Sequence, residues 1–198
     1  MVNGDHDDHE TLVFDLDGTL VRLAVDWDEA AEAAAAVLES RGVSPSGDLW
    51  AMLETADRTG HREAVEAVLA DRERDGARDS ERLPAADTVP GGAGVNTDAN
   101  TGIDAGVDAD VGVCSLNCEA ACRVALEVHD IGGVDAVVGR DTVETEKPDP
   151  EPLLETVRRL GGDPAETLFV GDSERDEVTA ERAGTDYVYV SEWLRAYA

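Results

Sequence analysis

The chain contains almost no lysine, because Lys147 is the only lysine among its 16 basic residues. Its 45 acidic residues give a net charge of −29 and an isoelectric point of about 4.1. Such a surface repels the polyanionic backbone of nucleic acids and anionic lipid surfaces, which argues against nucleic-acid or membrane partners. No apolar run is long enough to span a bilayer, and the acidic tail at residues 1–10 lacks a signal-peptide pattern. We therefore expect a cytoplasmic protein.

Aromatic residues are also scarce, at 4% of the sequence. The composition of the chain resembles that of proteins from salt-accumulating halophiles, because it has few lysines, few aromatics and many acidic, Ala and Val residues. Molar salt shortens the Debye length to about 3 Å and screens the self-repulsion of such a chain. We therefore predict a salt-dependent, halophilic fold, with an acidic mesophilic protein as the alternative.

The three cysteines, Cys114, Cys118 and Cys122, are spaced four residues apart. This spacing fits no zinc pattern, and three cysteines cannot all pair with one another. We expect them to be small buried side chains in a reducing compartment.

Hydrophobic patterning divides the chain into an alternating strand and helix region and an inserted helical block. Apolar runs predict strands at 11–16, 111–115, 134–138, 168–171 and 187–190. Helical spacing predicts helices at 117–128, 150–160, 174–183 and 193–198, and a block of helices from residue 26 to about residue 84. Alternating strands and helices indicate an α/β fold with a doubly wound, Rossmann-like parallel sheet.

Two carboxylates stand at the end of the first predicted strand, in Asp15-Leu16-Asp17-Gly18-Thr19-Leu20. Asp15 and Asp17 can converge on one site, because ligands bind at the carboxyl edge of open parallel sheets. Paired carboxylates suit a hard cation such as Mg²⁺, and one of them can attack phosphorus. An acidic strand end without a function is the simpler alternative.

Later strands end in further polar groups. Ser115 and Asn117 follow the strand at 111–115, where a hydroxyl at a helix start can bind phosphate oxygens or only cap the helix. Asp172 follows the strand at 168–171 and can complete a metal site with Asp15, and Asp176, one helical turn further on, can support that site from behind. Lys147 precedes Pro148 in a loop, where its ammonium can act as a point charge for a phosphate or an aspartate.

Together these motifs resemble the haloacid dehalogenase-like superfamily of aspartate-nucleophile phosphohydrolases. The first motif matches Asp15 to Leu20 without a gap, the second Ser115, the third Lys147 in a Lys-Pro-x-Pro form, and the fourth Gly171-Asp172 with Asp176. The Lys-Pro-x-Pro form is common in the branch that resembles phosphoglycolate phosphatase. The helical block then resembles the small all-helical cap of that branch.

The resemblance implies a mechanism and a set of roles. Asp15 would be the nucleophile, and Asp17 would act first as acid and then as base. Mg²⁺ would be held by Asp15, the backbone carbonyl of Asp17, and Asp172. The substrate phosphate would be bound by Ser115, Asn117, Lys147 and the backbone amides near Leu16 and Gly18. Asp176 and Thr19 would support these groups from behind. An acid at Asp17 makes dehalogenation unexpected, because a halide leaving group needs no proton.

The resemblance also predicts the domain organisation. The phosphohydrolase core would comprise residues 11–22 and 88–198, and the helical cap residues 23–87. Within the core, residues 91–109 are an acidic, glycine-rich, low-complexity segment. Candidate contacts from the cap or its rim, each equally well explained as a surface residue, are Arg22, Arg58, His61 and Arg62.

Three functions are compatible with this sequence. The first is a Mg²⁺-dependent phosphatase of small phosphorylated metabolites, with phosphoglycolate-like substrates first. The second is a phosphomutase of the same superfamily, which keeps the acid at Asp17. The third is a non-catalytic scaffold that binds phosphate or metal. The sequence does not identify the substrate or the oligomeric state.

Overall fold

The computed structural model describes residues 9–91 and 109–197. Most of the predicted acidic tail and of the segment 91–109 therefore lie outside the described residues. In chain order the elements are β1 (Thr11–Phe14), β2 (Val21–Arg22), α1 (Trp27–Ser40), α2 (Leu49–Thr59), α3 (Arg62–Arg78), β3 (Glu81–Arg82), the 3₁₀ helix η2 (Pro84–Thr88), β4 (Asp110–Cys114), α4 (Glu119–Val128), β5 (Ala136–Val138), α5 (Glu151–Leu160), the 3₁₀ helix η3 (Pro164–Glu166), β6 (Thr167–Gly171), α6 (Glu174–Ala183), β7 (Asp186–Tyr189) and α7 (Val190–Tyr197).

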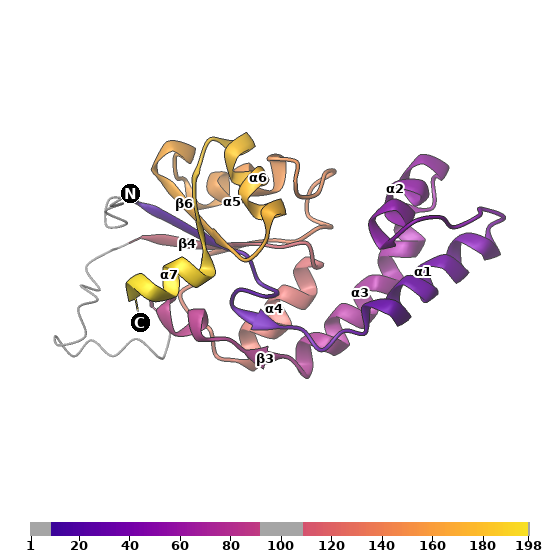
Figure 1. The fold of residues 1–198 in the computed structure, drawn as a ribbon, viewed down its shortest axis with the longest axis horizontal. Helices are drawn as coiled ribbons and strands as arrows, with labels where there is room; N and C mark the ends of the chain where they lie inside the picture. Colours follow the sequence, from indigo (N-terminus) through magenta and orange to yellow (C-terminus); the bar gives the residue numbers. More distant parts are fainter. Residues whose placement is uncertain (1–8, 92–108, 198) are drawn as a thin grey trace.

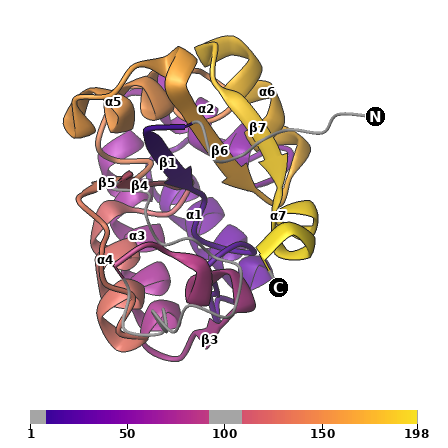
Figure 2. The same cartoon turned by 90° about the vertical axis from the view of Figure 1, so that its left-hand side faces the viewer.

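The core is a five-stranded sheet in the order β5-β4-β1-β6-β7. Every neighbouring pair is parallel, with β1 at the centre between β4 and β6. Figure 2 shows α5 and α6 on one side of this sheet and α4 and α7 on the other. The doubly wound parallel sheet predicted from the sequence is thereby confirmed.

Side-chain alternation along β1 explains why both faces are covered. Leu12 and Phe14 pack in one core cluster with residues of α4 and α7, whereas Val13 packs in another with residues of α5 and α6. On the first face the ring of Phe14 meets the indole of Trp193 edge to face, with centroids 5.7 Å apart. All of these β1 side chains are buried, and each contributes about 1.5–3 kcal/mol by leaving water. The central strand is thus anchored from both sides.

Helices α1 to α3 form the cap, which extends from one end of the sheet (Figure 1). The cap has a small core of its own, in which Leu38, Leu53 and Leu69 are fully buried. Asp26 caps α1 by accepting hydrogen bonds from two backbone amides, and Asp48 caps α2 by accepting one. The cap is therefore packed independently of the sheet, and α3 also packs against α4.

The structure differs from the sequence prediction at the base of the cap. The helical block showed no strand signals, yet β2 and β3 pair as a short antiparallel ribbon where the chain leaves the core and returns to it. Two residues per strand are too few to produce a recognisable alternation. Among residues 9–91 and 109–197, no helix is long and apolar enough to cross a bilayer.

Candidate active site

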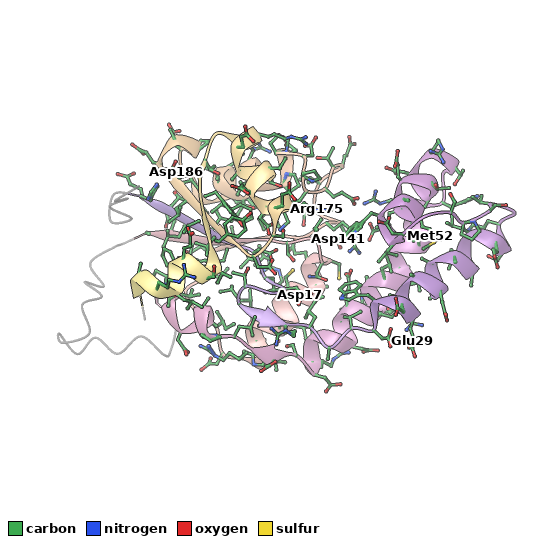
Figure 3. All side chains as sticks on the ribbon, in the orientation of Figure 1. Asp17, Glu29, Met52, Asp141, Arg175 and Asp186 are labelled. Atoms are coloured by element: carbon green, nitrogen blue, oxygen red, sulfur yellow. The ribbon has the colours of Figure 1, made fainter. Side chains whose placement is uncertain are left out.

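Loops at one edge of the sheet bring the predicted polar residues together. Asp15 directly follows β1, Ser115 follows β4 and Asp172 follows β6. Lys147 comes from the loop between β5 and α5. Because parallel strands present their carboxyl ends at the same edge, these side chains converge beside the cap. In Figure 3, Asp17 lies at the end of the core that faces the cap helices.

Lys147 is the centre of a buried ion cluster. Its Nζ lies 2.7 Å from Asp15 Oδ1 and 2.5 Å from Asp176 Oδ1, and it also donates to the carbonyl of Cys114 at 3.2 Å. The three donors of the ammonium therefore each have an acceptor. Burial disfavours the charged ammonium, but attraction to the two carboxylates is stronger and raises the pKa of Lys147 above its ordinary value. Lys147 is therefore a fixed positive charge beside Asp15.

Three carboxyl groups of the site, those of Asp15, Asp17 and Asp172, have raised pKa values. Burial raises the pKa of Asp15 to about 7, although Lys147 opposes the rise. Burial likewise raises the pKa of Asp17, against a hydrogen bond of 2.8 Å that Asp17 Oδ1 accepts from the backbone amide of Leu23. The pKa of Asp172 is also raised, by burial and then by a neighbouring carboxylate. A carboxyl group with a raised pKa can hold and release a proton near neutral pH.

Three carboxylates could hold a metal ion. Oxygens of Asp15, Asp172 and Asp176 lie within 4.8 Å of one another. Hydrogen bonds from Lys147 and Ser173 already occupy both oxygens of Asp176, which favours Asp15 and Asp172 as the ligands. A cluster of carboxylate oxygens fits a hard cation such as Mg²⁺. The sequence predicted Asp176 as a supporting residue, and its bonds to Lys147 and Ser173 are of that kind.

Gly18 brings the first loop close to Asp172. Its φ of +90° lies in the left-handed region, and a Cβ atom there would be 2.1 Å from Asp172 Oδ2. The amide of Gly18 donates to the carbonyl of Val21 at 2.8 Å. That bond removes this amide from the donors predicted for phosphate. The glycine instead permits contact between the two acidic loops.

The remaining predicted residues lie around this cluster. Ser115 is buried, and its Oγ accepts hydrogen bonds from the backbone amide of Asn117 at 3.1 Å and from Asn117 Nδ2 at 3.2 Å. Thr19 is also buried, and its Oγ1 has no hydrogen-bond partner within residues 9–91 and 109–197. The carbonyl of Leu16 accepts the amides that close the first loop. Ser115 and Asn117 thus form one rigid polar unit.

A cavity of about 590 Å³ opens between these residues and the cap. Its core wall includes Asp15, Asp17, Lys147, Asp172 and Arg175. Its cap wall consists of Trp27, Asp28 and Ala31 from α1, the α2 cap residue Asp48, and Leu49 and Trp50 from α2. The cavity therefore gives a bound molecule simultaneous access to the acidic cluster and to the cap.

The structure assigns the cap contacts to residues that the sequence analysis did not select. None of Arg22, Arg58, His61 and Arg62 belongs to the described lining of this cavity. Trp50 and Trp27 line it instead, and the guanidinium of Arg175 stacks on the Trp50 ring at 4.8 Å from its centroid. The available signal was that two of the three tryptophans in an aromatic-poor chain lie within the predicted helical block.

A second buried ion cluster, which we call the Arg140 cluster, joins the cap to the core. It consists of Arg140, in the loop after β5, and of Glu66 and Glu73 on α3. Arg140 lies 2.7 Å from Glu66 Oε2 and 2.6 Å from Glu73 Oε1, and it also donates to the carbonyl of Leu116 at 2.6 Å. Glu73 in turn accepts the amide of Cys118 at 2.8 Å. The loop after β4 is therefore held by α3 of the cap.

Comparison with known proteins shows which family the chain resembles. Residues 107–190 match the model of the family described as haloacid dehalogenase-like hydrolase. A phosphoglycolate phosphatase from Mesorhizobium japonicum is 49% identical over 55 residues, which are 28% of this chain and 24% of that protein. The pyrophosphatase PpaX of Bacillus mycoides is 47% identical over 64 residues, 32% of this chain and 30% of that protein.

The matched segments therefore span about a quarter to a third of the length of these curated relatives. A solved structure covers much more of the chain. The crystal structure of a subfamily IA hydrolase of this superfamily from Geobacter sulfurreducens has a TM-score of 0.55 and 26% identity, and the match covers 91% of this chain and 89% of that one. With its motifs at the strand ends of this fold, the chain is similar to haloacid dehalogenase-like hydrolases and, among them, to proteins named phosphoglycolate phosphatase.

Proposed function

We propose that this protein is a Mg²⁺-dependent phosphatase of small phosphorylated metabolites and that it works through an aspartyl-phosphate on Asp15. The observation that carries the proposal is the contact of 2.7 Å between Lys147 and Asp15, buried at the floor of a cavity that is open to the cap. A fixed ammonium orients the attacking carboxylate. It also offsets the negative charge that develops on the phosphoryl group as the carboxylate oxygen attacks phosphorus.

In the first step a carboxylate oxygen of Asp15 attacks phosphorus, and the bond from phosphorus to the leaving oxygen breaks. Asp17 gives its proton to that oxygen, which departs as an alcohol. The raised pKa of Asp17 and its place on the cavity wall support this role. The hydrogen bond from Leu23 holds the carboxyl group in one orientation during the transfer.

In the second step Asp17, now a carboxylate, takes a proton from a water molecule. The oxygen of that water attacks the phosphorus of the aspartyl-phosphate, the bond from phosphorus to the Asp15 oxygen breaks, and inorganic phosphate leaves. Lys147 stays charged throughout, because the carboxylates beside it raise its pKa. Ser115 and the amide of Leu16 bind phosphoryl oxygens in both steps.

Asp15, Asp172 and the backbone carbonyl of Asp17 are the groups that would hold Mg²⁺. When bound, the ion neutralises the negative charge of the phosphoryl group in this acidic site. The closeness of the Asp15 and Asp172 oxygens supports this assignment. Asp176 keeps Lys147 in place through its contact of 2.5 Å.

The test is hydrolysis of p-nitrophenyl phosphate in multimolar KCl, with Mg²⁺ and with EDTA, for the wild type and for Asp15→Asn. Asp75→Asn, a change of an exposed aspartate on α3, is the matched control. We expect Mg²⁺-dependent release of one phosphate per nitrophenol, abolished by Asp15→Asn and unaffected in the control. A folded wild-type protein without turnover would favour a non-catalytic binder, and transfer of phosphate to a sugar phosphate in place of water would favour a mutase.

A further inference from the structure

Of the large apolar side chains in the part of the chain that the structure describes, Trp27 and Val128 are the exposed ones. Val128 ends α4 and does not line the cavity, but Trp27 is 39% exposed and stands on the cavity wall. An indole left in water at the mouth of a reactive site has apolar area to bury against a ligand. Trp27 therefore marks where the non-phosphate part of a substrate would lie.

The rest of the cap wall extends this surface. Ala31 and Leu49 line the cavity near Trp27, and Leu116 contributes a further apolar side chain from the core. The Trp50 ring is already covered by the Arg175 guanidinium, which also donates to the carbonyl of Lys147 at 3.3 Å. The flat groups around the cavity therefore suit a flat ligand more than a compact one.

The charged side chains on the cap wall also favour a leaving group of this kind. The cap presents two carboxylates to the cavity, Asp28 and Asp48, and no basic side chain among its described lining residues. Asp48 Oδ1 is fixed by the amide of Ala51 at 2.9 Å, so this carboxylate stays beside the cavity. A carboxylate on the leaving group would meet these like charges, whereas hydroxyl or amino donors would be accepted by them.

The size of the cavity is the third observation. About 590 Å³ lies within the range of roughly 300–1,000 Å³ of pockets that enclose drug-sized ligands. A two-carbon acid ester leaves most of such a space filled with water, while an ester with a ring system fills more of the cavity that Trp27 and Asp15 both line. Volume, apolar surface and charge thus favour the same class of leaving group.

We propose that this phosphatase acts on monoesters whose leaving group carries an uncharged aromatic or heterocyclic ring with hydrogen-bond donors, such as a nucleoside monophosphate, and discriminates against small carboxylated esters such as phosphoglycolate. The proposal rests on the proposed function. It assigns Trp27 as the stacking residue for the ring, with Asp28 and Asp48 as acceptors for its donors.

The experiment compares kcat/KM for AMP, ribose 5-phosphate and phosphoglycolate under the same salt and Mg²⁺ conditions. AMP and ribose 5-phosphate share the same phosphate-bearing carbon, so their ratio isolates the contribution of the ring. We expect AMP to exceed both other esters by about tenfold, which corresponds to the stacking and burial of one ring face. We expect Trp27→Ala to lower kcat/KM for AMP toward the ribose 5-phosphate value, chiefly by raising KM.

Two further variants make the result specific. Trp27→Phe retains a ring and should keep most of the preference for AMP, and Val128→Ala removes the other exposed apolar side chain without touching the cavity. Equal kcat/KM for AMP and ribose 5-phosphate would overturn the proposal while leaving the phosphatase intact. A preference for phosphoglycolate that Arg175→Gln abolishes would also overturn it, and would make Arg175 a receptor for a carboxylate. Turnover of none of the three esters, with p-nitrophenyl phosphate also inert, would refute the proposed function itself.

Discussion

Replacing Arg140 with methionine tests whether the Arg140 cluster holds the cap on the core. Methionine keeps an unbranched apolar stem in the place of the arginine stem and removes the guanidinium. The change leaves Glu73, which is fully buried, with the backbone amide and the thiol of Cys118 as its remaining described partners. It also releases the carbonyl of Leu116, which lines the active-site cavity. The perturbation therefore acts on stability and on the cavity wall together.

The expected loss of stability is large because the charged groups of the Arg140 cluster are buried away from water. The side chains of Arg140 and Glu73 are 1% and 0% exposed, and that of Glu66 is 15% exposed. Removing one partner of a buried ion pair costs about 3–5 kcal/mol, mostly because the remaining charge stays buried without its partner. At this chain length 1 kcal/mol shifts Tm by about 2–4 °C. We therefore expect Tm to fall by about 6–20 °C.

The assay is thermal unfolding in multimolar KCl, followed by circular dichroism. Arg158→Met is the matched control, because Arg158 also contacts two glutamates but is 53% exposed, and exposed ion pairs contribute little to stability. Adding Glu73→Met to Arg140→Met should recover part of the loss by removing the buried carboxylate. If Arg140→Met unfolded at the same temperature as Arg158→Met, the cluster would not be what joins α3 to the core.

Two further predictions concern backbone geometry and acid stability. Gly18→Ala should reduce kcat about hundredfold, because its Cβ would lie 2.1 Å from Asp172 Oδ2 and displace a proposed metal ligand. Gly42→Ala has a similar positive φ with open space around it, so an equal loss of kcat there would show that backbone strain alone is responsible. Burial opposes the shift, but hydrogen bonds and attraction from Arg140 and Arg62 lower the pKa of Glu66 below its ordinary value of 4.5. The stability from this carboxylate is therefore complete above that value and is lost as pH falls through the lower folded pKa, so the fall in Tm on acidification should be smaller in Glu66→Gln than in the wild type.

Much of the core could be predicted from the sequence because its signals are local. The strand before Asp15 and the helix at 174–183 follow directly from apolar runs and stop residues, and the structure has that helix at the predicted bounds. The prediction that the motif residues lie at one site then needed only the rule that parallel strands have their carboxyl ends at the same edge of the sheet. The salt dependence inferred from composition stays a prediction.

The contacts between cap and core could not be predicted in this way. Arg140 looked like one of many loop arginines, and its burial depends on two glutamates more than sixty positions earlier in the chain. The spacing of Glu66 and Glu73 along α3 puts them on one helix face, but nothing local says which element that face meets. The same is true of Trp27, because nothing local says that the start of α1 lies on the wall of a cavity shared with the core.

The choice between arginine and lysine at the two buried clusters follows from their geometry. Arg140 bridges two carboxylates and a carbonyl, which the planar, multiply donating guanidinium can reach at once. At Asp15 the acceptors are two carboxylates and the Cys114 carbonyl around a single point, and a compact ammonium with three donors matches them. Among the 16 lysine and arginine residues of the chain, the one lysine therefore stands where the acceptors surround a single point.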